Sequence, residues 1–195
     1  MIKRFSRRGG ALLLCFALIC GMLAGCSDVR NMVSGVAVAG EFPVEVAGVT
    51  ISARPQKVVV LSPSLADVVL ALGYETQLTA GAQECTQESL RDLNKLSRDD
   101  AQAIMDAGPD LVLLDAESGA SASALEEAGI TVLSIAPATD REDFERLYSE
   151  VSSALAGGGA GHDEGIRVAQ DIFLTLDAIN RIVPSDRVTT ACYLY

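Results

Sequence analysis

Two uninterrupted apolar runs constrain the fold more than any other feature of the sequence. They are residues 58–61 (VVVL) and residues 111–114 (LVLL). A strand with one face in water alternates polar and apolar side chains, and these runs do not alternate. An unbroken run of Val and Leu is typical of a parallel strand that helices bury on both faces. The sequence therefore favours an α/β fold.

Further strands and helices are predicted around these runs. Strand patterns occupy residues 44–51 (a short hairpin), 77–80 and 131–135, and helical patterns occupy residues 65–72, 101–107 and 140–155, with a short helix around Leu125. Ser64, Ser97 and Thr139 each precede an acidic residue by three positions, which is the spacing of a capping box at a helix start. Strands that alternate with helices through short loops predict a Rossmann-like lobe with a mainly parallel sheet.

Three loops form the candidate ligand face of this lobe. In open α/β sheets, ligands bind beyond the carboxyl ends of the strands. That rule selects residues 62–64, 83–85 and 115–118. The hydroxyls of Ser62 and Ser64 either cap a helix or hydrogen-bond a ligand, and a helix start at this point favours an anionic group.

The carboxyl-terminal part has a different pattern. The glycine-rich residues 157–161 predict a hinge or linker, and residues 161–183 predict one long amphipathic helix that Pro184 ends. Residues 187–195 predict the first strand of a further unit. The apolar stripe of Ile166, Phe173 and Leu176 is expected to be exposed unless another part of the protein covers it.

The beginning of the chain predicts export. Residues 1–25 combine a basic start with a short apolar run, as in a signal peptide. Residues 23–26 (LAGC) resemble the lipobox of bacterial lipoproteins. That resemblance implies cleavage before Cys26 and attachment of a diacyl, palmitate-type lipid to its thiol. Residues 26–41 are small and lack periodicity, so they predict a flexible tether.

Composition excludes several classes of function. The formal net charge is −11, and four of the 15 basic residues lie in the first 25, so residues 26–195 carry 11 basic and 26 acidic side chains and a net charge of −15. Such a surface repels phosphate backbones, and we expect no nucleic-acid partner. A single histidine, His162, excludes a site of several imidazoles. We expect no metal ion and no cofactor, and we expect Cys85 and Cys192 to be unpaired thiols.

The order of several motifs resembles a known family. Residues 57–67 (KVVVLSPSLAD), 71–73 (ALG) and 108–113 (GPDLVL) resemble the amino-terminal lobe of cobalamin- and siderophore-type substrate-binding proteins of ABC importers. In that family one long helix joins two α/β lobes, and the ligand lies between them. The resemblance implies a substrate-binding lobe at residues 42–160, an inter-lobe helix at residues 161–183 and an incomplete second lobe from residue 187.

The same resemblance implies a function. It implies a solute-binding component, anchored by lipid on the extracytoplasmic face of a Gram-positive type of cell membrane. Its ligand would be an iron–siderophore, haem or cobalamin-type molecule, delivered to ABC permease and ATPase subunits. The matching positions imply ligand contacts at Ser62, Pro63, Ser64 and Cys85, and the rule for strand ends adds Gln83, Glu84, Glu117 and Ser118. Glu84 and Cys85 either face the ligand cleft or lie on a loop without contacting a ligand.

Permease docking in this family uses an acidic residue before the second motif. The matching position holds Gln102, a departure from the pattern, with Asp99 and Asp100 one turn upstream. Those two carboxylates either meet permease arginines or offset a helix dipole. Cys85 stands where some members place an aromatic ring against the ligand.

Two other classes of protein stay open. One is a surface lipoprotein that binds a protein or a cell-wall component, and the other is a hydrolase. A Ser or Cys nucleophile needs a nearby base, and the single histidine lies in a predicted linker, so we expect no enzymatic activity. A lone lobe buries a ligand from one side, so we expect residues 26–195 to bind a chelate or corrinoid weakly or not at all, and to be partly oligomeric.

Overall fold

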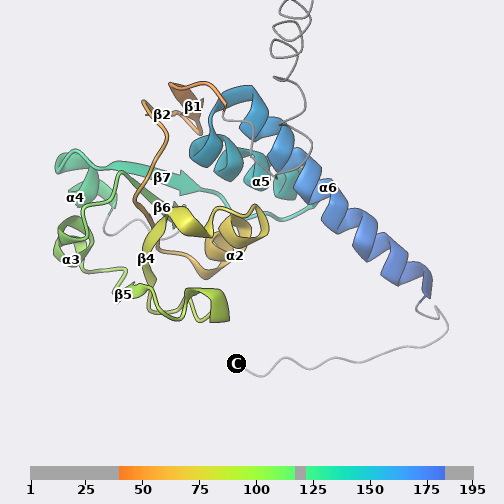
Figure 1. Cartoon of the computed structure of the whole chain (residues 1–195), viewed down its shortest axis with the longest axis horizontal. Coiled ribbons are helices and arrows are strands. Elements are labelled where there is room, and N and C mark those ends of the chain that lie inside the picture. Colours follow the sequence, from red (N-terminus) through yellow and green to blue (C-terminus); the bar gives the residue numbers. More distant parts are fainter. Residues whose placement is uncertain (1–39, 117–121, 183–195) are drawn as a thin grey trace, which may run out of the picture. The chain divides into compact units, whose positions relative to one another are not determined.

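The computed structural model describes residues 40–116 and 122–182 (Figure 1). Five predicted features lie outside the described residues: the signal, Cys26, most of the tether, Glu117 with Ser118, and the strand at residues 187–195. The residues that the structure describes place the lobe and the long helix that follows it.

Five parallel strands form one sheet. They are β3 (Val58–Val60), β4 (Leu78–Ala82), β5 (Asn94–Leu96), β6 (Leu111–Asp115) and β7 (Thr131–Ile135), and their order is β5-β4-β3-β6-β7. The chain builds outward from β3 to β5 and then returns to the other side of β3 for β6 and β7. The direction of winding therefore reverses between β3 and β6. The predicted Rossmann-like α/β class is confirmed.

Helices bury both faces of the sheet, as the apolar runs predict. Alternate side chains of β3 point to opposite faces, so Val58 and Val60 share one core with α2 (Pro63–Ala71) and α5 (Arg141–Ala156). Val59 belongs to the second core, with α3 (Ala101–Asp106) and α4 (Ala122–Glu127). All three valines have no exposed surface. A strand buried on both sides has no position for a polar residue, which explains the run.

The predicted hairpin is confirmed. Strands β1 (Val44–Val46) and β2 (Val49–Ile51) pair antiparallel. Ala47 (φ 47°) and Gly48 (φ 79°) both have positive φ, as a two-residue turn of type I′ requires. Val46 and Ile51 are buried in the core that includes α5, so the hairpin closes one end of that core.

The glycine-rich residues 157–161 are not a flexible linker, which corrects the prediction. Gly157 (φ 97°) makes the turn after α5, and α6 (Gly158–Ile182) begins at the next residue. Gly161 and Gly165 are buried against α5, and a β-carbon on Gly161 would lie 2.9 Å from the α-carbon of Ser153. The glycines therefore permit two helices to pack backbone to backbone.

Helix starts differ from the predicted capping boxes. Ser62, not Ser64, caps α2, where its Oγ accepts a hydrogen bond from the Leu65 amide at 3.4 Å. Asp100, not Ser97, caps α3, and Asp140, not Thr139, caps α5. In each case the capping side chain bonds an amide three residues later, so the motif is present but its register differs from the prediction.

Three short elements had no periodic signal in the sequence. Strand β5 pairs with β4, yet Leu96 is its one buried residue. The 3-10 turns η2 (Glu75–Gln77) and η3 (Glu88–Leu90) flank β4 in the chain.

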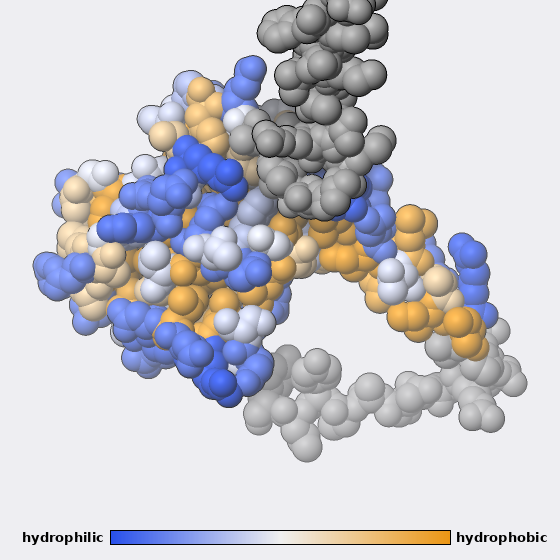
Figure 2. Space-filling model, viewed as in Figure 1, coloured by the Kyte–Doolittle hydropathy of each residue, from blue (hydrophilic) through white to orange (hydrophobic). Residues whose placement is uncertain are grey.

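The distal part of α6 exposes large apolar side chains, which gather along the helix in Figure 2. They are Leu174 (65% exposed), Leu176 (47%), Ile179 (50%) and Ile182 (81%). The predicted exposed stripe is therefore correct for Leu176, whereas Ile166 and Phe173 are half-buried. Within residues 40–116 and 122–182, no helix combines the length and the apolar character that a membrane span requires.

Candidate ligand-binding site

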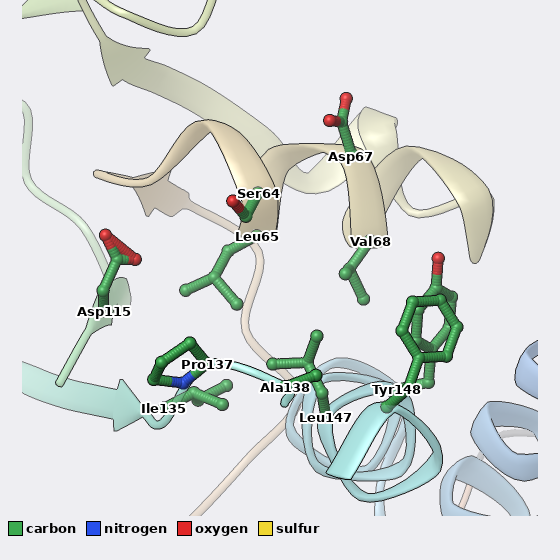
Figure 3. Close-up of a pocket in the computed structure, with 11 residues that line it drawn as sticks. Ser64, Leu65, Asp67, Val68, Asp115, Ile135, Pro137, Ala138, Leu147 and Tyr148 are labelled. Atoms are coloured by element: carbon green, nitrogen blue, oxygen red, sulfur yellow. The ribbon is translucent and has the colours of Figure 1, made fainter. Parts of the chain in front are cut away.

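A pocket of about 530 Å³ opens at the carboxyl ends of β3, β6 and β7 (Figure 3). It lies where the winding of the sheet reverses, which is the usual position of a ligand in a doubly wound fold. Eleven residues of α2, α5 and the ends of two strands line it: Ser64, Leu65, Asp67, Val68, Asp115, Ile135, Pro137, Ala138, Phe144, Leu147 and Tyr148.

The floor of the pocket is apolar. Figure 3 shows Leu65 and Val68 of α2 pointing toward Pro137, Ala138 and Leu147 on the other side. The side chains of Leu65 and Leu147 are 2% and 7% exposed, so the floor continues into the core below. The floor can therefore bury the apolar edge of a ligand without leaving polar groups unpaired.

Carboxylates and hydroxyls occupy the rim. The Asp115 carboxylate accepts a hydrogen bond from Arg98 Nη2 at 2.9 Å, and both side chains are 30% exposed. On the other side of α2, Gln87 Nε2 donates to Asp67 Oδ1 at 2.9 Å and to the Pro63 carbonyl at 3.0 Å. This amide fixes the Asp67 carboxylate to the start of α2.

Tyr148 joins the pocket to α6 through a row of aromatic rings. Burial and the charge of Asp67 raise the pKa of Tyr148, so its phenol is protonated at neutral pH. Its ring centroid lies 4.6 Å from that of Phe144, which lies 5.1 Å from that of Phe173 on α6. The Arg141 guanidinium covers Phe173 at 4.6 Å from the ring centroid and donates to Asp177 at 2.7 Å.

Of the three residues predicted to contact a ligand in the first loop, only Ser64 lines the pocket. Ser64 is exposed and lines the pocket. Ser62 is 1% exposed and its hydroxyl caps α2, so the capping interpretation applies and a ligand contact by its side chain is excluded in this conformation. Pro63 is half-buried at the first helical position and does not line the pocket.

The second predicted loop lies at the same edge of the sheet but outside the pocket lining. Gln83 and Glu84 are exposed directly after β4. Cys85 is a free thiol with no exposed surface, and its Sγ contacts the Val60 carbonyl at 4.0 Å. Burial raises the pKa of this thiol. The expectation that Cys85 faces a ligand is therefore corrected, because the loop turns its side chain into the core.

The predicted docking residues are exposed at the start of α3, which follows β5 and so begins at the edge of the sheet that bears the pocket. Asp100 Oδ1 accepts a hydrogen bond from the Ala103 amide at 3.0 Å. Gln102 Nε2 donates to Asp106 at 2.8 Å. Asp100 thus has a structural role in capping α3, and the Asp99 carboxylate precedes it on the same surface.

Sequence reasoning missed most of the pocket wall. Ile135 ends β7 and Pro137 and Ala138 follow it, and the rule that ligands bind at carboxyl ends of strands could have found this loop. Phe144, Leu147 and Tyr148 carry no such signal, because their helical periodicity predicts a core face and does not say that part of it lines a pocket. No group of His, Cys, Asp and Glu in the described part of the chain is arranged to hold a metal ion.

The structure has the parallel α/β lobe, the pocket at the reversal of winding and the long following helix that the resemblance to a two-lobed solute-binding family implies. In sequence the chain is 31% identical over 158 residues to the uncharacterized ABC transporter substrate-binding lipoprotein YvrC of Bacillus subtilis. The match covers 71% of this chain and 48% of the relative, so the chain spans about half the length of that protein. No family model matches the sequence.

Solved structures share the fold. The heme binding protein HmuT superposes with a TM-score of 0.61 at 16% identity, over 75% of this chain and 52% of HmuT. A possible iron-binding (periplasmic solute-binding) protein from Staphylococcus epidermidis gives 0.59 at 14%, over 69% and 54%. The vitamin B12 binding protein BtuF of Vibrio cholerae gives 0.53 at 15%, over 66% and 51%. The resemblance to the amino-terminal lobe of an ABC transporter substrate-binding lipoprotein is confirmed.

Proposed function

We propose that the chain supplies the amino-terminal lobe of the solute-binding component of an ABC importer. In this proposal residues 42–160 form the ligand-binding lobe and residues 161–183 the inter-lobe helix. The observation that carries it is the pocket at the carboxyl ends of β3, β6 and β7, which is accessible from the edge of the lobe and has an apolar floor. Its polar rim and apolar floor suit a large chelate or corrinoid that presents both kinds of surface.

The similarity to known proteins supports the ligand class. YvrC is named as a substrate-binding lipoprotein of an ABC transporter. The structural neighbours are named for binding iron, heme and vitamin B12. An iron–siderophore, haem or cobalamin-type ligand, delivered to permease and ATPase subunits, is therefore the function that the pocket and the similarity favour together.

Membrane attachment and docking complete the proposal. Cys26 would carry a diacyl lipid that holds the protein on the extracytoplasmic face of the cell membrane. One acyl chain binds a membrane only marginally, whereas two give stable retention. Asp99, Asp100 and Gln102 would face the permease from the start of α3. The exposed side chains of this surface lie at the edge of the sheet that carries the pocket, so docking and ligand release would occur on one side of the lobe.

Filling the pocket tests this function. Ala138 lines the pocket, and Ala138→Trp would occupy the space of the ligand, whereas Ala53→Trp places the same ring on an exposed residue before β3, at the opposite edge of the sheet. Equilibrium dialysis of residues 26–195, with Cys26→Ser, against cyanocobalamin, ferrioxamine B and hemin would measure binding. Because one lobe buries a ligand from one side, we expect weak but saturable binding of at least one probe, weakened about tenfold or more by Ala138→Trp and unchanged by Ala53→Trp. Equal binding by the two variants would contradict the proposal.

A further inference from the structure

The charged side chains that line the pocket have one sign. They are Asp67 and Asp115, and none of the lining residues that the structure describes is Lys, Arg or His. Arg98 lies close to the rim, and its guanidinium donates to the Asp115 carboxylate. A ligand with a carboxylate at this rim would therefore have to compete with Asp115 for Arg98, whereas a cationic or neutral group would not.

The start of α2 does not reverse this balance. A helix N-terminus attracts anions through its free amides, but Pro63 at the first position has no N–H. The Leu65 amide is already bonded to the Ser62 hydroxyl, which leaves less of the helix start for an anion. Fewer free amides are therefore available to an anion at the start of α2, because Pro63 has none and the Leu65 amide is bonded to the cap.

The charge of one of these carboxylates acts on the pocket wall. Burial, and after it the negative charge of Asp67, raise the pKa of Tyr148. The net charge of −15 on residues 26–195 (11 basic and 26 acidic side chains) adds a long-range potential of the same sign. Negative potential at short and long range therefore disfavours an anionic ligand.

The lining also offers little to a bare metal ion. Its two carboxylates, Asp67 and Asp115, already accept hydrogen bonds from Gln87 and Arg98, and no group of three or more His, Cys, Asp and Glu in the described part of the chain is arranged to hold a metal ion. The single histidine, His162, lies exposed on α6 and does not line the pocket. A metal ion in this pocket would have to arrive with its coordination sphere already filled.

We propose that this lobe selects its ligand by charge, taking a neutral or cationic chelate whose metal ion is fully coordinated before binding, and disfavouring anionic ligands such as haem with its two carboxylates. The inference rests on the proposed function, because it concerns the same pocket. Of the iron–siderophore, haem and cobalamin-type ligands, this selection by charge favours the neutral or cationic hydroxamate chelates and the corrinoids.

Ligands that share one scaffold and differ mainly in charge test this selection. Ferrioxamine B carries a free ammonium group, its N-acetyl derivative is neutral and its N-succinyl derivative is anionic, on one hydroxamate scaffold. Cyanocobalamin and its monocarboxylic acid form a second such pair. On the scaffold that binds, we expect the anionic derivative to bind about three- to tenfold more weakly than the neutral one at low ionic strength, with the difference shrinking in 0.5 M salt.

A lysine at the rim of the pocket should remove or reverse the preference for neutral over anionic derivatives. Ser64→Lys places a cation on the pocket lining, and Thr76→Lys places the same charge on an exposed residue before β4, at the opposite edge of the sheet. We expect Ser64→Lys to remove or invert the preference against the anionic derivative, and Thr76→Lys to leave it within about twofold of the parent protein.

The outcomes separate the two proposals. Saturable binding with no charge order, or with the anionic derivative or hemin tightest, would overturn charge selection and leave the solute-binding function standing. An equal effect of the two lysine variants would overturn the assignment of selection to this pocket. Retention of none of the probes at millimolar concentration would overturn both proposals.

Discussion

A β-carbon placed on Gly165 of α6 would lie 2.5 Å from the α-carbon of Ser149 on α5. Real β-carbons do not approach a backbone so closely, so α5 and α6 pack at a distance that no residue other than glycine permits at this position. Tyr148, which lines the pocket, neighbours Ser149 in sequence, and its carbonyl oxygen lies equally close to that point. The contact between α6 and the part of α5 that bears Tyr148 therefore requires glycine at position 165.

Substituting Gly165 should reveal this dependence. Gly165→Ala must push the two helices apart, and overpacking of this kind costs about 1–3 kcal/mol of unfolding free energy. Gly159 is the matched control, because it lies on the same helix, is exposed and has no atom within 4 Å of its added β-carbon. Gly159→Ala should stabilise the protein by about 0.5–1 kcal/mol through its helix propensity. Urea unfolding followed by circular dichroism measures both, and equal effects would contradict the close contact.

The ion pair between Arg141 and Asp177 should be visible in a titration. The hydrogen bond from Arg141 lowers the pKa of Asp177. The pair therefore stabilises the folded state at pH values above the ordinary pKa of an aspartate, about 3.9. This stabilisation is lost as the pH falls through the lower pKa that Asp177 has in the folded state. Nuclear magnetic resonance of the Asp177 carboxyl carbon should show its pKa rising toward the ordinary value in Arg141→Gln. Arg54→Gln, at an exposed arginine before β3, should leave it unchanged. An unchanged titration in Arg141→Gln would exclude the pair.

The Cys85 thiol should be unreactive in the folded protein. It is fully buried and burial raises its pKa, so little thiolate forms at neutral pH and little reagent reaches it. In residues 26–195 with Cys26→Ser and Cys192→Ser, Cys85 is the one remaining cysteine, and its reaction with a thiol reagent should be more than about tenfold slower in buffer than in urea. Moving the thiol two residues, with Cys85→Ala and Gln83→Cys, places it on an exposed position and should restore fast reaction. Fast native reaction of Cys85 would show that the loop opens.

The exposed apolar residues of α6 should cause self-association. Leu174 and Ile179 are 65% and 50% exposed, and uncovered side chains of this kind favour contact with another apolar surface. Sedimentation velocity of residues 26–195 over a range of concentrations should show oligomers that Leu174→Gln with Ile179→Gln reduces. The control pair Thr175→Gln with Ala178→Gln changes exposed positions of the same helix that are not large and apolar. A parent protein that is monomeric at every concentration would refute this prediction.

The lipid anchor has its own test. Cys26→Ala removes the thiol that accepts the acyl chains, so uncleaved precursor should accumulate and labelling with radioactive palmitate should be lost. Cys20→Ala, within the signal, is the control and should leave labelling intact. Equal labelling of the parent and Cys26→Ala would end the lipoprotein proposal.

The local sequence determined most of the lobe. Residues 58–61 and 111–114 predicted buried parallel strands, and β3 and β6 occupy them because a strand covered on both faces admits few polar residues. The hairpin was predicted by alternating valines around Ala47 and Gly48, whose positive φ values suit its turn. The rule that ligands bind at carboxyl ends of strands placed Ser64 and Asp115 at the correct edge of the sheet before any contact was known.

Only the tertiary structure decided what closes the pocket and what fills the core. The helical periodicity of Phe144 and Tyr148 predicted burial, but their place in the pocket wall depends on how α5 crosses the end of the sheet. The glycine-rich residues 157–161 predicted a hinge or linker when considered alone, whereas Gly161 permits tight packing against α5 inside a helix. Cys85 was placed on a ligand-facing loop, and the loop turns it inward. Periodicity and turn chemistry act over a few residues and can be predicted from sequence, whereas a pocket is formed by residues far apart in the chain that only packing brings together.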